Sequence, residues 1–203
     1  MRDVRYTMGL DLGQTRNYTA MVVMERVWHA ATAAEFIASG TRGYQGEWKY
    51  TLVRAERVSL GTPYPRVVEW VKAVAKEYGD ELTIVVDASG VGSAVVDALR
   101  RAELGVQLVG VVITGNQASP PGRGTGVTPA GYYTVSRAEL LTGMQMAVQV
   151  RRFEVDRPRC REWEALRREL SIVRLEGGVT KGKKSQDDLA FALALVIWWG
   201  MRL

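Results

Sequence analysis

The pattern of apolar and polar positions divides the chain into a strand-rich first part and a second part in which helices and strands alternate. Residues 7–12 and 18–28 are two β-rich runs joined by the polar segment GQTRN, and residues 47–60 alternate as a third strand would. Three consecutive strands predict an antiparallel meander. Residues 62–80 open with prolines and repeat apolar residues at a helical period as far as Gly79, so a helix should follow the meander.

A second set of strands and helices follows. The segment LTIVVDASG, residues 82–90, is a continuous β-branched run, which is typical of a central strand covered on both faces. Residues 92–104 predict a helix and residues 106–114 the next strand. The order up to this point is therefore βββαβαβ.

The remaining chain predicts a loop and three helices. Residues 115–131 are rich in glycine and proline and predict a long loop or mobile hairpin. Residues 134–150 and 159–173 have helical patterns, with a strand as the alternative for LSIVRLE at 170–176, and a last helix should begin at about Ser185. We expect one domain, residues 1–203, with an α/β fold: a mixed central sheet, antiparallel meander plus parallel strands, flanked by helices.

Composition limits the chemistry that this domain can perform. The chain of 203 residues is 47% hydrophobic and has a net charge of +5 from 21 Arg and 6 Lys. This favours an acidic partner such as nucleic acid, although a GC-rich genome or a hot habitat would also enrich arginine. His29 and Cys160 are the only residues of their types, so catalysis should rely on carboxylates. The apolar run at 189–199 is shorter than the ~18 residues of a membrane span and indicates a buried helix.

Carboxylates stand at three predicted element ends. Asp11 ends the first strand, Asp87 ends the central strand, and Asp187 and Asp188 open the last helix. A buried charge costs several kcal/mol unless it is paired or bound to a metal, and ligands of α/β sheets bind beyond the carboxyl ends of strands. The aspartates should therefore converge. Each also has a structural explanation, namely a turn at Asp11 and helix capping at the others.

An oxygen-rich site without histidine or thiolate suits Mg²⁺ or Mn²⁺, and two such ions can catalyse in-line displacement at phosphorus. The segment GLDLGQT also resembles the phosphate loop of the actin and sugar-kinase ATPases, but the chain is too short for their two domains. The segment GGVTKGKKS nearly matches a nucleoside-triphosphate phosphate loop, except that Lys184 replaces the hydroxyl residue.

Basic residues near the predicted site are candidates for contact with DNA. Lys181, Lys183 and Lys184 directly precede the paired aspartates and could meet phosphates or only solvate their loop. Arg151 and Arg152 belong to a longer arginine-rich stretch and are its least neutralised members.

Four segments together resemble the nuclease domain of the bacteriophage terminase large subunit, a member of the ribonuclease H-like superfamily. They are GLDLGQTRNYTAMVV, TIVVDASGVGSAVVDAL, YYTVSRAELLTGMQMAVQVRRFEV and SQDDLAFALALVIWW, and they span nearly the whole chain. The resemblance implies Asp11, Asp87 and Asp188 as catalytic ligands of two Mg²⁺ or Mn²⁺ ions, with Asp187 close to the second ion. It places Arg137 where the family often has lysine, and we expect Arg137 to contact DNA there.

The resemblance also implies a function and partners. The implied activity is a metal-dependent endonuclease that cuts double-stranded DNA with little sequence specificity during genome packaging, in the cytoplasm of an infected bacterium. The implied partners are DNA, a packaging ATPase domain, the portal and the small terminase subunit, with no membrane. Residues 115–134 would form a mobile hairpin beside the site, and Gln186 stands where the family often has histidine.

Two alternatives to this function stay open. A Holliday-junction resolvase shares the GLDLG type of first strand and would prefer branched DNA, whereas a non-catalytic nucleic-acid-binding module would use the carboxylates structurally. The family's packaging ATPase domain is missing from this sequence, which predicts either an excised nuclease domain or a separate related nuclease.

Overall fold

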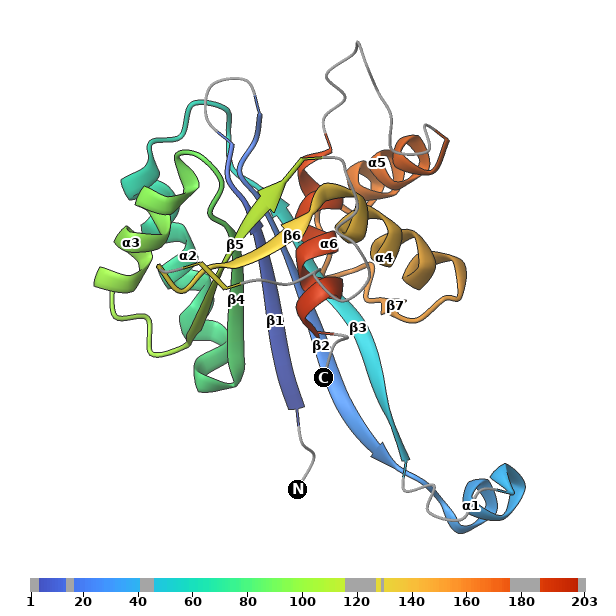
Figure 1. Cartoon of the computed structure of the whole chain (residues 1–203). Helices are drawn as coiled ribbons and strands as arrows, with labels where there is room; N and C mark the ends of the chain where they lie inside the picture. Colours follow the sequence, from blue (N-terminus) through green and yellow to red (C-terminus); the bar gives the residue numbers. More distant parts are fainter. Residues whose placement is uncertain are drawn as a thin grey trace.

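The computed structural model describes residues 4–13, 17–40, 46–115, 127–128, 130–175 and 187–200 (Figure 1). These residues form seven strands, six α-helices and one 3₁₀ turn. In chain order the elements are β1 (Val4–Asp11), β2 (Ala20–Ala30), α1 (Ala33–Ser39), β3 (Gly46–Arg57), α2 (Tyr64–Tyr78), the 3₁₀ turn η1 (Gly79–Glu81), β4 (Leu82–Asp87), α3 (Gly92–Arg101), β5 (Gln107–Thr114), β6 (Tyr133–Ser136), α4 (Arg137–Gln149), β7 (Glu154–Val155), α5 (Trp163–Leu175) and α6 (Asp188–Gly200).

The strands form one mixed sheet in the order β6-β5-β4-β1-β2-β3-β7. β1, β2 and β3 pair antiparallel, as the predicted meander requires. β4 pairs parallel with β1, and β5 and β6 continue the parallel half of the sheet. The predicted fold class, an antiparallel meander joined to parallel strands and flanked by helices, is therefore confirmed.

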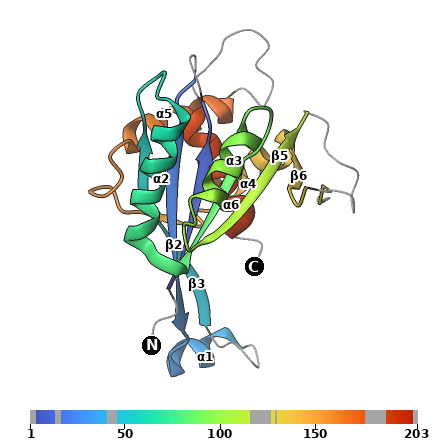
Figure 2. The ribbon, with the colours of Figure 1, turned by 90° about the vertical axis from the view of Figure 1, so that its left-hand side faces the viewer.

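Helices cover both faces of the sheet. α2 and α3 lie on one face, and α4, α5 and α6 on the other (Figures 1 and 2). The alternation of side chains along a strand explains why both faces are apolar: Ile84 and Val86 of β4 join the core under α2 and α3, whereas Val85 joins the core under α6. β4 is therefore the doubly covered central strand that its continuous apolar sequence predicts.

Some local predictions were wrong. α1 interrupts the meander between β2 and β3, where no helix was predicted. Residues 133–136, assigned in part to a helix, form β6, and the helix starts only after Ser136, whose hydroxyl accepts a hydrogen bond from the Glu139 N–H. The strand alternative for 170–176 is wrong as far as residue 175, because α5 continues to Leu175. The short strand β7 was not predicted either.

The last helix is the most deeply buried element. Apart from Trp199, every residue of α6 is buried, and the helix packs against β1, β2 and α4. It begins at Asp188, and the predicted start at Ser185 lies outside the described residues. Among the helices of the described residues, none combines the length and apolar character needed to cross a bilayer.

Candidate active site

The carboxyl ends of β1 and β4 lie next to each other. The strands pair in parallel with Leu10 opposite Val86, so Asp11 and Asp87 are the next residues on adjacent strands. Both residues therefore lie at the carboxyl ends of parallel strands, which is where an α/β sheet binds its ligands.

Gly9 in β1 allows the last helix to approach the same ends of the strands. A Cβ atom at Gly9 would overlap the carbonyl oxygen of Ala192, so only glycine allows the backbone of α6 to approach β1 this closely. The helix begins at Asp188, whose carboxylate accepts a hydrogen bond from the N–H of Tyr18, just before β2, at 3.3 Å. The start of α6 is thereby fixed beside the ends of β1 and β4.

The pKa values of the aspartates reflect this crowding. Burial raises the pKa of Asp11 well above its ordinary value, and the negative charges of Asp87, Asp188 and Asp187 raise it further. Burial also raises the pKa of Asp87, against hydrogen bonds from Ser89 that lower it. The pKa of Asp188 is raised to about 6, first by burial and also by the charge of Asp187. The four aspartates therefore form one electrostatically coupled cluster.

Each of three aspartates has a protein partner. Asp87 accepts a hydrogen bond from the Ser89 N–H at 2.8 Å, Asp188 accepts one from Tyr18, and Asp187 forms an ion pair with Arg137 at 2.8 Å. Within the described ranges, no three carboxylate, imidazole or thiol groups converge closely enough to hold a metal ion. The carboxylates are near one another without meeting at one point, and the partners of Asp87, Asp187 and Asp188 hold these three in their positions.

Arg137, predicted to contact DNA, lies inside this neighbourhood. It is the first residue of α4, and its guanidinium lies 3.9 Å from the centre of the Phe191 ring of α6 while it pairs with Asp187. The side chain is 40% exposed, so part of it faces solvent. A cation is therefore available at the rim of the acidic cluster.

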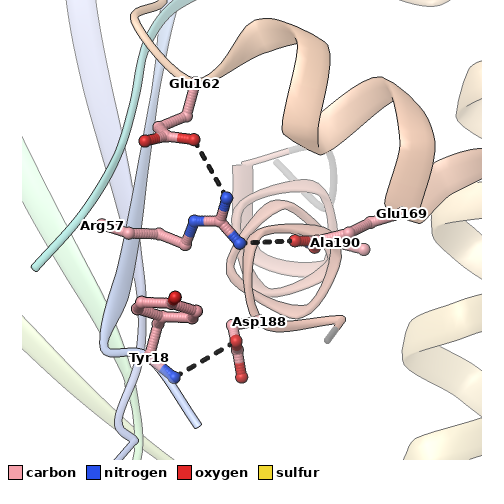
Figure 3. Close-up of polar contacts among 6 residues, drawn as sticks. All are labelled: Tyr18, Arg57, Glu162, Glu169, Asp188 and Ala190. Carbon is pink, nitrogen blue, oxygen red and sulfur yellow. Dashed lines mark hydrogen bonds and ion pairs between the residues drawn. The ribbon is translucent and has the colours of Figure 1, made fainter. Parts of the chain in front are cut away.

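The structure adds two residues that sequence reasoning missed. Glu169 of α5 is 5% exposed and accepts a hydrogen bond from the Ala190 N–H at 2.9 Å (Figure 3). Arg57, at the end of β3, binds the same carboxylate at 3.2 Å. Burial raises the pKa of Glu169 to about 7. The sequence signal was only partial: Glu169 follows Ala165 and Leu166 at helical spacing, which puts it on the apolar side of α5 but does not show which element it contacts.

The other predicted basic residues that the structure describes are not at the cluster. Arg151 and Arg152 are exposed and follow the C-terminus of α4, at the opposite end of the helix from Arg137. Lys181, Lys183 and Lys184 lie outside the described residues, as does Gln186. Of the predicted hairpin at 115–134, residues 116–126 and 129 also lie outside them, while Val127 forms an antiparallel bridge with Tyr133.

Comparisons with known proteins identify the fold. No protein-family model and no curated protein matches the sequence. Among solved structures, the large terminase nuclease from thermophilic phage G20c with bound zinc matches with 17% identity and a TM-score of 0.53, over 97% of this chain and 82% of the other. The nuclease domain of the large terminase subunit of bacterial virus Sf6 matches with 13% identity and a TM-score of 0.56, over 95% and 87%. A mutant of that domain with manganese and beta-thujaplicinol matches equally, with a TM-score of 0.57.

The protein is therefore an α/β protein of the ribonuclease H-like fold. More particularly, its fold is that of the phage large terminase nuclease domains, over nearly the whole chain. The predicted resemblance to that domain is confirmed at the level of the fold.

Proposed function

We propose that the protein is a divalent-metal-dependent endonuclease that hydrolyses phosphodiester bonds of double-stranded DNA with little sequence specificity. Its role would be to cut concatemeric phage DNA during genome packaging. The observation that carries the proposal is the coupled cluster of Asp11, Asp87 and Asp188, which comes from two adjacent strand ends and the start of a buried helix. The likeness to terminase nuclease domains supports it.

In donor type, although not in its present spacing, the cluster suits Mg²⁺ or Mn²⁺. The donors are carboxylate oxygens alone, which hard divalent cations prefer. The raised pKa values of Asp11 and Asp188 mean that mutual repulsion and burial disfavour their charged forms, and a cation would relieve that repulsion. Asp11, Asp87 and Asp188 would hold two ions, with Asp187 as a further ligand. Bound ions would supply positive charge that lowers the pKa of water and stabilises the leaving oxygen.

The protein's own groups would orient the reacting centre. Asp87 is fixed by the Ser89 N–H and Asp188 by the Tyr18 N–H, so neither carboxylate has to be ordered when DNA binds. Arg137 offers a partly exposed basic side chain at the rim, where its guanidinium could bind a phosphate oxygen beside the scissile bond. The partners would be double-stranded DNA, a packaging ATPase domain, the portal and the small terminase subunit, in the cytoplasm of the infected host.

Plasmid nicking tests the proposal. Supercoiled plasmid incubated with the protein and Mn²⁺ or Mg²⁺ should be nicked and linearised, and the products should carry 5′ phosphates and 3′ hydroxyls. EDTA should abolish cutting, and Asp11→Asn should reduce it at least about 100-fold, because one of the carboxylates that would hold the ions is lost.

The matched control is Asp80→Asn, which removes an exposed carboxylate in η1 and should leave cutting unchanged. Cutting that is insensitive to EDTA or to Asp11→Asn would exclude the proposed site. Strong preference for a four-way junction over linear duplex would favour a resolvase, and DNA binding without cutting would favour a non-catalytic binding module.

A further inference from the structure

A closed ring of contacts joins four parts of the fold behind Asp188 (Figure 3). The guanidinium of Arg57 binds Glu169 of α5, and Glu169 accepts the Ala190 N–H of α6. Two residues earlier in α6, Asp188 accepts the N–H of Tyr18, and the Tyr18 ring lies 4.8 Å beneath the same Arg57 guanidinium. The ring therefore connects β3, α5, α6 and the segment that precedes β2.

Glu169 acts as a capping residue supplied by another helix. The first N–H groups of an α-helix have no partner within the helix, and those of α6 are buried. Glu169 satisfies the Ala190 N–H at 2.9 Å and brings negative charge to the positive end of the helix. The position of the first turn of α6, which contains Asp188, thus depends on a carboxylate of α5.

Arg57 in turn holds Glu169 in place. Its two terminal nitrogens bind separate carboxylates, Glu169 at 3.2 Å and Glu162 at 3.0 Å, and its side chain is only 15% exposed. A planar guanidinium can bridge two carboxylates and stack on an aromatic ring at the same time, which an ammonium group cannot do. Arg57 therefore reaches the start of α6 through two of its neighbours, Glu169 and Tyr18.

We propose that Arg57 and Glu169 are positioning residues of the metal site, which fix the first turn of α6 so that Asp188 can serve as a ligand. This inference rests on the proposed function. Neither residue acts on DNA or on a reacting atom: Arg57 orients Glu169, Glu169 caps α6, and the cap fixes Asp188 beside Asp11.

The two ways in which Arg57 could influence a cation have opposite signs. A positive charge near the site repels a divalent ion, so a purely electrostatic role predicts tighter Mn²⁺ binding when Arg57 is removed. A positioning role predicts weaker binding, because Asp188 loses its fixed place. The double variant Arg57→Ala with Glu169→Gln removes one charge of each sign and so isolates the geometric effect.

Mn²⁺ binding to the protein without DNA is the decisive measurement. The free Mn²⁺ signal in electron paramagnetic resonance, recorded at pH 8 during titration, gives the dissociation constant. We expect the double variant to bind Mn²⁺ at least about tenfold more weakly, the range typical of residues that orient metal ligands. Arg57→Lys, which keeps the charge and disturbs the fold least, should also weaken binding. Cutting at saturating Mn²⁺ should recover most of the original maximal rate.

Arg54→Ala is the matched control. Arg54 is also in β3, its side chain is 16% exposed, and it also contacts two carboxylates, Glu56 and Glu77, but none of these belongs to the ring. It should lower the free energy of unfolding without changing Mn²⁺ affinity. Unchanged or tighter Mn²⁺ binding in both Arg57 variants, or an equal loss in Arg54→Ala, would overturn the positioning role alone. Absence of Mn²⁺ binding by the unaltered protein would instead overturn the proposed function, and this inference with it.

Discussion

Asp188 is a carboxylic acid in surroundings that disfavour its charged form when no cation is bound. It is 2% exposed, and it lies next to Asp187 and close to Asp11. Burial and the neighbouring negative charge both favour the protonated carboxyl, so its pKa rises from 3.8 to about 6. The hydrogen bond from Tyr18 opposes this rise without cancelling it. The carboxylate therefore lowers the stability of the fold at neutral pH while it remains suitable for binding a cation.

The variant Asp188→Asn should reveal this loss of stability as a function of pH. Because the folded pKa is raised, the folded state keeps a proton that the unfolded chain releases near pH 4, and stability is lost as pH rises from there to about 6. Asp188→Asn has no such loss. In EDTA it should melt at the same temperature as the original protein at pH 4 and about 5 °C higher at pH 8. Thermal denaturation followed by circular dichroism measures this; a difference that is the same at all pH values would contradict it.

At the scale of elements, the approach of α6 to β1 is the contact that assembles the site. A Cβ atom at Gly9 would overlap backbone atoms of Ala192, which cannot move without shifting the whole helix. We expect Gly9→Ala to lower the free energy of unfolding by about 3 kcal/mol, the upper range for inserting a methyl group into a packed core. Urea denaturation measures the loss.

The control for this variant is another glycine in a regular element. Gly143 lies within α4, and nothing lies within 4 Å of the place where its Cβ would be. Gly143→Ala should therefore stabilise the protein by about 0.5–1 kcal/mol, the ordinary gain in a helix. If Gly9→Ala lowered the free energy of unfolding by no more than the amount that Gly143→Ala adds, α6 would adapt easily. The close approach of α6 to β1 would then not be what fixes the site.

Sequence periodicity predicted the elements whose burial follows a simple rule. β4 reads as a continuous apolar run because helices cover both its faces, and α2 shows one apolar stripe because only one of its faces is buried. β6 and β7 are only four and two residues long, too short for any period to be visible. Their positions depend on pairing with β5 and β3, which local sequence does not encode.

The same limit applies to the candidate site. Asp11 and Asp87 could be predicted as neighbours because each ends a recognisable strand, and the carboxyl ends of parallel strands lie together. Arg57 and Glu169 could not, because their contact joins the end of β3 to the middle of α5 across 112 positions of the chain. In the sequence Glu169 is one acid in an arginine-rich helix. Only packing reveals that it is buried against α6.

At the scale of the whole molecule, α4 links the acidic cluster to two exposed arginines. Arg137 at its first residue lies in the cluster, and Arg151 and Arg152 follow its C-terminus. A helix of 13 residues is about 20 Å long, which corresponds to about six base pairs of duplex. Under the proposed function, duplex bound along α4 would have its scissile phosphate at the aspartates, and the net charge of +5 would favour that binding.

Replacing both distal arginines tests this path. Arg151→Gln together with Arg152→Gln should weaken binding of a 30-base-pair duplex, whatever its sequence, and reduce the slope of log affinity against log salt by about 2, one for each lost phosphate contact. Fluorescence anisotropy at several salt concentrations measures the slope. Mn²⁺ affinity should not change, because neither residue lies at the aspartates.

The control, Arg66→Gln with Arg101→Gln, removes the same charge from exposed positions of α2 and α3 on the opposite face. If both double variants reduce the slope equally, only overall charge matters, and DNA does not follow α4.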